Sequence, residues 1–167
     1  MQLEWLGKYR LLVEKIIKYG NIYSRTYRKN HLYGTDRVFS AAELQTLEYI
    51  LENENEHQNM AEIASRLGVS RSTLSKNVKM MLDKGLLEKY HTYDNRKDII
   101  IKPSEEGRHV YEQYCIFAQK DFFDKMFEIL EDVPDEHIEK FMKVIDLLAD
   151  NLIEDKEDEE KILIKIE

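Results

Sequence analysis

The sequence predicts a mainly α-helical protein that carries one small β-hairpin. Glycine and proline are scarce, at six and two of 167 residues, and apolar residues recur mainly at intervals of three and four, the period of an amphipathic helix. Two short strand-like segments, residues 86–91 and 98–102, flank a polar tip at residues 92–97 and predict the hairpin. Hydrophobic residues make up 43% of the chain, which is enough for a sizeable core and excludes a disordered chain.

The first helix is predicted over residues 3–27. Its apolar and aromatic side chains follow a coiled-coil-like spacing of threes and fours, with Gly20 in the gap, at Leu6, Tyr9, Val13, Ile16, Tyr23 and Tyr27. The following stretch, residues 28–39, contains Gly34 and little periodicity, so we expect a connector.

Capping residues predict where the next helices begin. Ser40 with Glu43 is the pattern of a capping box, and the helix it opens should end in the polar run of residues 53–58. Asn59 with Glu62 is a similar pair and predicts a second, short helix.

A glycine turn follows the short helix and leads into a third one. Gly68 is the expected left-handed turn residue, Ser70 is the expected cap, and the third helix should run to about Lys84 and stop at Gly85. A short helix, a glycine turn and a capped second helix in this order are the signature of a helix-turn-helix.

The two sides of the third helix differ in chemistry. At 100° per residue, one side is aliphatic and the other is polar, with Leu74, Val78, Met81 and Leu82 opposite Ser72, Ser75, Lys76 and Lys79. A helix that packs one side on a core and presents donors on the other can enter the ~12 Å major groove of B-DNA. At its start, Ser70, Arg71 and Ser72 offer backbone N–H groups to a phosphate.

The tip of the hairpin supplies a second expected contact. Residues 93–97 place Arg96 and Lys97 at its most exposed point, where a guanidinium could enter a narrow minor groove. A polar helix face or a basic turn alone is usually only solvated surface. Together, in this order and spacing, they predict a winged helix.

The C-terminal third is predicted to be helical and apolar on one side. Ser104 should cap a long helix through Leu130, and after Pro134 a last helix carries Ile138, Phe141, Ile145, Leu148 and Leu152. The seams of the first and last helices exceed what a winged domain of ~60 residues needs for its own core, which favours a dimer over a monomeric helical bundle.

The net charge of −8 conceals local basic regions. Residues 1–39 carry a net +5 and residues 59–102 a net +4, whereas residues 40–58 carry −5 and residues 103–167 carry −12. Because exposed charges farther apart than ~10 Å are largely screened at ordinary salt, a basic face can still dock on phosphates. The charge distribution therefore permits DNA binding without proving it.

The segments LGVSRSTLSKNVKMMLDKGLLEK and RKDIIIKPSEEG resemble the MarR family of bacterial transcription regulators, over roughly residues 39–107. The resemblance implies a homodimeric winged-helix protein that binds an inverted-repeat operator in double-stranded DNA. Family members commonly act as repressors and release DNA in response to a small ligand, a metal or an oxidant.

The resemblance also implies a division of the chain and a set of DNA-binding residues. Residues 1–39 would be the N-terminal dimerisation helix and connector, 40–103 the winged helix-turn-helix, 104–155 the C-terminal dimerisation helices and 156–167 a charged tail. The DNA-binding residues would be Ser70, Arg71, Ser72, Thr73, Ser75, Lys76, Lys79, Asn95, Arg96 and Lys97.

The wing departs from the family pattern. Relatives often carry Asp-x-Arg just before the second strand, and in the ungapped register this chain reads Asn95-Arg96-Lys97. A shift of one residue would give Asp94-x-Arg96. Because a lost aspartate would weaken the brace on the arginine, the role of Arg96 in the minor groove is a hypothesis.

Aromatic residues gather near the end of the first helix. Tyr19, Tyr23, Tyr27 and His31, with Tyr33 nearby, could form a site for a small aromatic effector, since relatives bind phenolic ligands between the dimer helices and the winged domain. The alternative is that these side chains belong to the core, as aromatic residues at helical spacing usually do.

Other chemistry finds little support in the sequence. The single cysteine, Cys115, is expected to be a packed thiol, and His109 with Glu112 is a weaker pattern for a metal than for an exposed helix histidine. No catalytic motif, cofactor motif, metal set, leader peptide or membrane span is recognisable, so we expect a cytoplasmic protein that is not an enzyme. The alternative function is a winged-helix module that binds protein without specific DNA binding.

Overall fold

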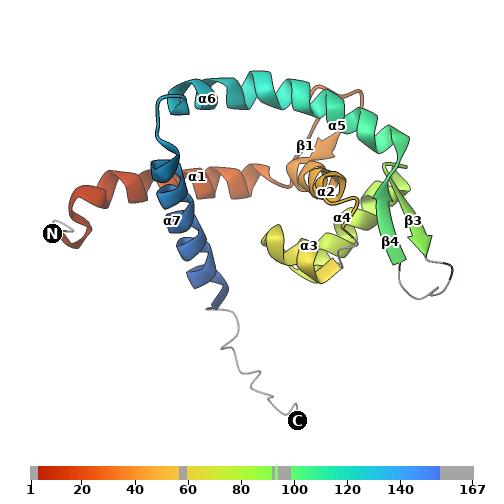
Figure 1. The fold of residues 1–167 in the computed structure, drawn as a ribbon, viewed down its shortest axis with the longest axis horizontal. Helices are drawn as coiled ribbons and strands as arrows, with labels where there is room; N and C mark the ends of the chain where they lie inside the picture. The colour runs from red at the N-terminus through yellow and green to blue at the C-terminus, as the bar shows by residue number, and fades with distance from the viewer. Residues whose placement is uncertain (1–3, 57–59, 92, 94–98, 155–167) are drawn as a thin grey trace, which may run out of the picture. The chain divides into compact units, whose positions relative to one another are not determined.

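The computed structural model describes residues 4–56, 60–91, 93 and 99–154. The chain divides into two compact units, Met1–Asp121 and Phe122–Glu167, each of which is described by itself. The first contains a winged helix-turn-helix, in which α2, α3 and α4 group together and the β3–β4 hairpin lies beside α4 (Figure 1). The predicted mainly α-helical fold with one wing is thus confirmed.

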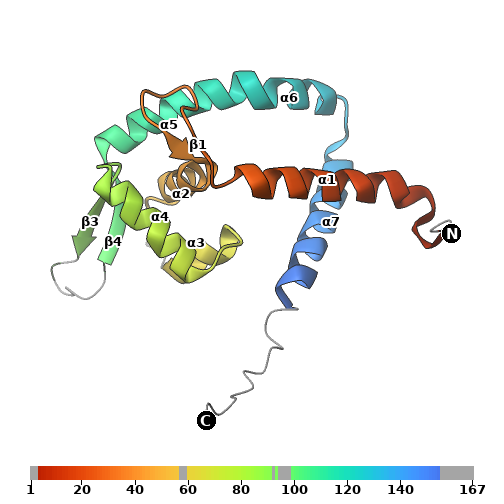
Figure 2. The ribbon, with the colours of Figure 1, turned by 180° about the vertical axis from the view of Figure 1, so that it is seen from behind.

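The predicted first helix is divided in two. A 3₁₀ segment, Glu4–Tyr9, is interrupted at Gly7, whose φ of 48° is left-handed, and α1 spans Arg10–Thr26. Most of the predicted seam is the less exposed side of this segment, although Tyr9 remains 58% exposed. Seen from behind, α1 runs towards β1, where the chain enters the winged-helix region (Figure 2).

The connector contains a strand pair that the sequence analysis did not predict. β1, Asn30–His31, pairs antiparallel with β2, Phe39–Ser40. Strands of two residues are too short to show an alternating pattern. The Thr35 hydroxyl lies 2.5 Å from the Leu32 carbonyl oxygen and 2.7 Å from that of Arg37, either of which can accept its single proton, and so closes the turn between the strands.

The predicted caps and turns of the helix-turn-helix are largely confirmed. α2 spans Ala41–Glu52 and begins in a complete Ser40–Glu43 capping box. α3 spans Met60–Arg66, and α4 spans Arg71–Asp83 with Ser70 as its cap. Gly68 and Gly85 end these helices with φ of 62° and 75°, as the turns require. The predicted Asn59 cap lies outside the described residues.

The wing is an antiparallel pair close to the predicted segments. β3, Leu87–His91, pairs with β4, Ile99–Pro103, in a register that places Leu87 opposite Pro103 and His91 opposite Ile99. Side chains from β2, α2, α3, α4, α5 and the wing close one core, whose largest fully buried hydrophobic members are Phe39, Leu44, Leu47, Leu74, Met81, Leu86 and Val110.

The predicted long helix after Ser104 is interrupted. α5 spans Glu105–Ala118 and begins at the predicted Ser104 cap, but a π-helical segment, Gln119–Phe123, separates it from α6, Asp124–Leu130. A π segment has more residues per turn than an α-helix, and in a segment this short an apolar spacing of three and four does not distinguish the two.

The second unit contains the last helix. α7 spans Asp135–Glu154 and carries the predicted apolar spacing, but in the single chain Phe141, Ile145 and Leu148 are 46%, 39% and 41% exposed. No helix among the described residues is both long and apolar enough to cross a membrane.

The start of α5 packs directly on the backbone that follows α4. A Cβ atom added to Gly107 would lie 2.2 Å from the Leu86 carbonyl oxygen, whereas one added to Gly20 would meet nothing within 4 Å. We therefore expect Gly107→Ala to lower the free energy of unfolding by roughly 2 kcal/mol or more. Gly20→Ala should raise it by up to about 1 kcal/mol, because alanine favours a helix interior. Urea unfolding at one protein concentration measures both, and equal effects would contradict the close approach.

Candidate nucleic-acid interface

The two sides of α4 are divided as the sequence predicts. Leu74, Val78 and Met81 are at most 5% exposed and belong to the core. The opposite side is open to solvent and presents hydroxyls and cations, from Ser70, Arg71, Ser72, Ser75, Lys76 and Lys79. Thr73, which was predicted with this group, is half-buried.

The start of α4 is fixed by its cap. The Ser70 hydroxyl oxygen accepts the backbone N–H of Thr73 at 3.1 Å and lies 2.9 Å from the hydroxyls of Ser72 and Thr73. The helix therefore begins at a defined residue, and its first turn offers the N–H groups and positive dipole end that favour an anion.

A buried polar contact, which sequence reasoning missed, joins α4 to α2. Asn77 is 6% exposed, and its amide donates to the Thr46 hydroxyl at 3.3 Å. That hydroxyl donates in turn to the Ala42 carbonyl at 2.7 Å. The available signal was that Asn77 lies between Leu74, Val78 and Met81 on the apolar side of the helix.

The first helix of the helix-turn-helix is attached to α2 by an exposed cation. Arg66 of α3 lies 3.4 Å from the Glu52 carboxylate, and its guanidinium lies 4.6 Å from the centre of the Tyr49 ring. Because both members of the ion pair are more than half exposed, its contribution to stability is small.

The described part of the wing extends beside α4, and Tyr93 in its tip is 97% exposed. The predicted contacts Asn95, Arg96 and Lys97 lie outside the described residues. The recognition surface that the structure describes is therefore the outer face of α4, defined here as Arg71, Ser72, Ser75, Lys76 and Lys79.

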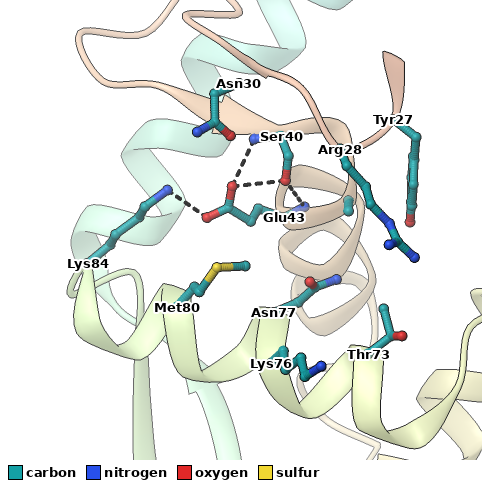
Figure 3. Close-up of a pocket in the computed structure, with 11 residues that line it drawn as sticks. Tyr27, Arg28, Asn30, Ser40, Glu43, Thr73, Lys76, Asn77, Met80 and Lys84 are labelled. Atoms are coloured by element: carbon teal, nitrogen blue, oxygen red, sulfur yellow. Dashed lines mark hydrogen bonds and ion pairs between the residues drawn. The ribbon is translucent and has the colours of Figure 1, made fainter. Parts of the chain in front are cut away.

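A cavity of about 540 Å³ lies behind α4, between that helix and the residues that connect α1 to α2 (Figure 3). Thr73, Lys76 and Met80 line it from α4, and Tyr27 and Arg28 line it from the end of α1. Lys76 and Thr73 thus belong both to the predicted DNA-binding residues and to the wall of the cavity.

An ion pair between α2 and the end of α4 forms part of this wall. The Glu43 carboxylate lies between the Lys84 ammonium, at 2.6 Å, and the Ser40 hydroxyl, at 2.9 Å (Figure 3). It also accepts the Ser40 backbone N–H at 2.8 Å. Burial acts to raise the pKa of Glu43, but the Lys84 and Ser40 donors outweigh it, so the pKa lies below the ordinary value.

The predicted aromatic cluster exists as two groups. Tyr23 stands between Tyr19 and Tyr27, with ring centres 5.7 and 5.3 Å apart, and burial with these neighbouring phenols raises its pKa to about 12. His31 meets Tyr33 edge to face at 5.5 Å. Of the four predicted effector residues, Tyr27 lines the cavity behind α4, and Tyr19 is 69% exposed.

The prediction of a packed thiol is wrong for the single chain, because Cys115 is exposed on α5. Its position one residue after the half-buried Tyr114 turns it away from the core side of the helix. Within the described ranges, no group of three or more histidine, cysteine, aspartate and glutamate side chains could hold a metal ion.

Comparison with known proteins finds a family model that matches the winged-helix region. The MarR family model matches residues 39–98. The HTH-type transcriptional repressor YetL of Bacillus subtilis is 22% identical over 166 residues, covering 91% of this chain and 97% of YetL. The alignment therefore extends well beyond the winged helix into the flanking helices.

Solved structures share the fold. The structure of MepR of S. aureus in complex with DNA has a TM-score of 0.61 and 16% identity, covering 87% of this chain and 99% of MepR. The structure of FabT of Streptococcus pneumoniae in complex with DNA has a TM-score of 0.60 and 17% identity, covering 89% and 100%.

The buried ion pair predicts an acid-sensitive stability. A glutamate whose pKa is lower in the folded than in the unfolded chain stabilises the fold fully above its ordinary pKa of about 4.3, and this contribution is lost as the pH falls through the lowered value. We expect Glu43→Gln to reduce the fall in unfolding free energy between neutral and acidic pH, measured by urea unfolding.

Glu54→Gln is the control for this measurement. It removes a carboxylate whose pKa is also lowered, by the Arg108 hydrogen bond, but which lies in a more exposed pair. Its effect on the pH dependence should be smaller because solvent screens the pair. An unchanged pH dependence in Glu43→Gln would show that the ion pair does not contribute.

Proposed function

We propose that this chain is a sequence-specific DNA-binding transcription regulator, because residues 39–98 match the MarR family model. It would act in the cytoplasm as a homodimeric repressor that a small ligand releases from an inverted-repeat operator. The observation that carries the proposal is a capped helix, α4, anchored on one side in the core and covered on the other with hydroxyls and cations.

The outer face of α4 suits base and phosphate contacts. Ser72 and Ser75 are short hydrogen-bonding side chains, and Arg71, Lys76 and Lys79 supply positive charge. Asn95, Arg96 and Lys97 would add contacts from the wing. MepR and FabT, which share the fold, were solved as DNA complexes.

Dimerisation is supported by apolar surface that the single chain leaves uncovered. On one face of α1, Leu12 and Tyr19 are 42% and 69% exposed, and on one face of α7, Ile145 and Leu152 are 39% and 71% exposed. Large exposed apolar faces mark sites of association. We propose that residues 1–39 and 104–155 form the dimer, which would present two copies of α4 to an inverted repeat.

The charge of the recognition surface distinguishes this function from a protein-interaction module. Arg71, Lys76 and Lys79 are basic, and Asp83 is the acidic residue that α4 carries at its end. A net positive outer face favours a polyanion such as DNA. We propose that the protein acts by binding DNA and not as an enzyme.

The cavity behind α4 is our proposed site for the releasing ligand. Arg28 and Lys76 supply positive charge and Tyr27 supplies an aromatic face, which together suit a small aromatic molecule that carries a carboxylate. Lys76 belongs to both surfaces, so an occupant that engages it would withdraw a cation from the DNA.

Selection of duplexes from a randomised pool, followed by fluorescence anisotropy across a salt series, tests the DNA-binding function. We expect an inverted repeat with half-sites about one helical turn apart. Lys79→Ala and Arg96→Ala should each weaken binding and reduce the salt slope by about one unit, because each removes a cation that neutralises phosphate charge. Lys120→Ala, outside the winged helix, should change neither. No enrichment and no binding at low salt would favour the protein-interaction module.

Displacement of the selected duplex by benzoate derivatives, compared with the matching benzamides, tests the ligand site. We expect carboxylates to displace DNA more effectively than the neutral amides. Arg28→Ala should remove most of this difference while retaining DNA affinity within about threefold, because it removes a cation from the cavity wall and none from the outer face of α4. Arg25→Ala, which does not line the cavity, is the matched control, and equal responses of the two variants would reject the site.

A further inference from the structure

Lys84, at the C-terminal end of α4, binds both the connector and α2. Its ammonium donates to the Glu43 carboxylate at 2.6 Å and to the Val38 carbonyl at 3.2 Å. The same ammonium lies 4.7 Å from the centre of the Phe39 ring. Connector, α2 and α4 therefore meet at one cation.

The backbone on the other side of this residue is tied to α5. Arg37 donates to the Lys84 carbonyl at 3.3 Å and pairs with the Glu106 carboxylate of α5. The Ser104 hydroxyl, at the start of α5, donates to the Gly85 carbonyl at 2.7 Å. The end of α4 is thus fixed between the two segments that lead to the proposed dimer helices.

The Glu43 carboxylate makes this arrangement stiff. Its side chain is 3% exposed, and a buried carboxylate that loses its cation is strongly unfavourable. Its second oxygen is already held by the Ser40 N–H and hydroxyl, so the carboxylate cannot follow a moving Lys84 without breaking its own cap. A tilt of α4 about its N-terminal end would move Lys84 and would therefore break the ion pair.

We propose that Glu43 and Lys84 are positioning residues for DNA reading, which set the orientation of α4 relative to the connector and α5. This inference rests on the proposed DNA-binding function. Base contacts carry the sequence information and need a helix held in one orientation, whereas binding to phosphates is independent of sequence. Loss of the ion pair should therefore reduce the discrimination between the selected duplex and unrelated DNA more than it reduces binding to unrelated DNA.

The test measures this discrimination, as the ratio of the dissociation constants for an unrelated duplex and for the selected duplex. Glu43→Gln keeps the size of the side chain and removes its charge. Lys84→Met removes the cation from a side chain that is one third exposed and leaves the Ser40 bonds in place. Lys84→Arg keeps a cation, and Glu52→Gln removes a carboxylate from an exposed pair on the same helix.

We expect the ratio to fall roughly tenfold in Glu43→Gln and in Lys84→Met, the size associated with loss of one charged hydrogen bond. It should stay within about twofold of the wild-type value in Lys84→Arg and Glu52→Gln. Circular dichroism at the assay temperature identifies the folded variants, and either of the two variants decides the test alone if the other does not fold.

A folded variant without the ion pair that keeps the wild-type ratio would overturn the proposal. An equal loss of affinity for both duplexes would also overturn it, because a merely structural role reduces the active fraction and leaves the ratio unchanged. If the wild-type protein itself prefers no duplex, the proposed DNA-binding function fails, and that failure is distinct from a failure of the positioning role.

Discussion

The arrangement of the winged-helix region depends most on the contacts that the Glu43 carboxylate makes with Ser40 and Lys84. This carboxylate completes the cap of α2 through Ser40 and at the same time binds Lys84 at the end of α4. A buried charge with a local partner and a distant partner couples the start of one helix to the end of another. The connector joins the same point through Val38 and Phe39, so the chain leaving α1 is tied to the helix that carries the recognition surface.

This coupling gives the cavity behind α4 a mechanical role in the proposed function. One wall is α4 itself and the opposite wall is the connector from α1, with the Glu43–Lys84 pair between them. An occupant that engages Arg28 or Lys76 would change the charge balance around this pair. Differential binding to two orientations of α4 is all that a ligand needs in order to shift the population between them.

The aromatic side chains near the end of α1 lie between the cavity behind α4 and α5. Tyr33 meets Tyr114 and Phe117 of α5 edge to face, at 6.0 and 6.1 Å, and Tyr23 stacks on Tyr19 and meets Tyr27 at a tilt. These contacts hold the connector against α5 and place Tyr27 on the cavity wall. Of these tyrosines, Tyr27 lines the cavity, whereas Tyr23 and Tyr33 pack against neighbouring rings, and the aromatic effector remains a prediction.

The sequence by itself determined the local elements of this protein. The Ser40, Ser70 and Ser104 caps, the Gly68 and Gly85 turns, the two sides of α4 and the hairpin all follow from backbone chemistry and periodicity within a few residues. Together with the family resemblance, they were sufficient to predict the fold and the recognition helix. The strands of the connector and the π segment after α5 escaped prediction because neither leaves a periodic signal.

Only the tertiary structure decided what joins these elements. The bond between Asn77 and Thr46 spans 31 positions in the sequence, and the pair of Lys84 with Glu43 spans 41. In the sequence, Glu43 is a capping residue and Lys84 the end of a helix, and no pattern links them. Packing of α2 against α4 brings them together, and desolvation then makes their pairing necessary, because a buried charge must meet an opposite one.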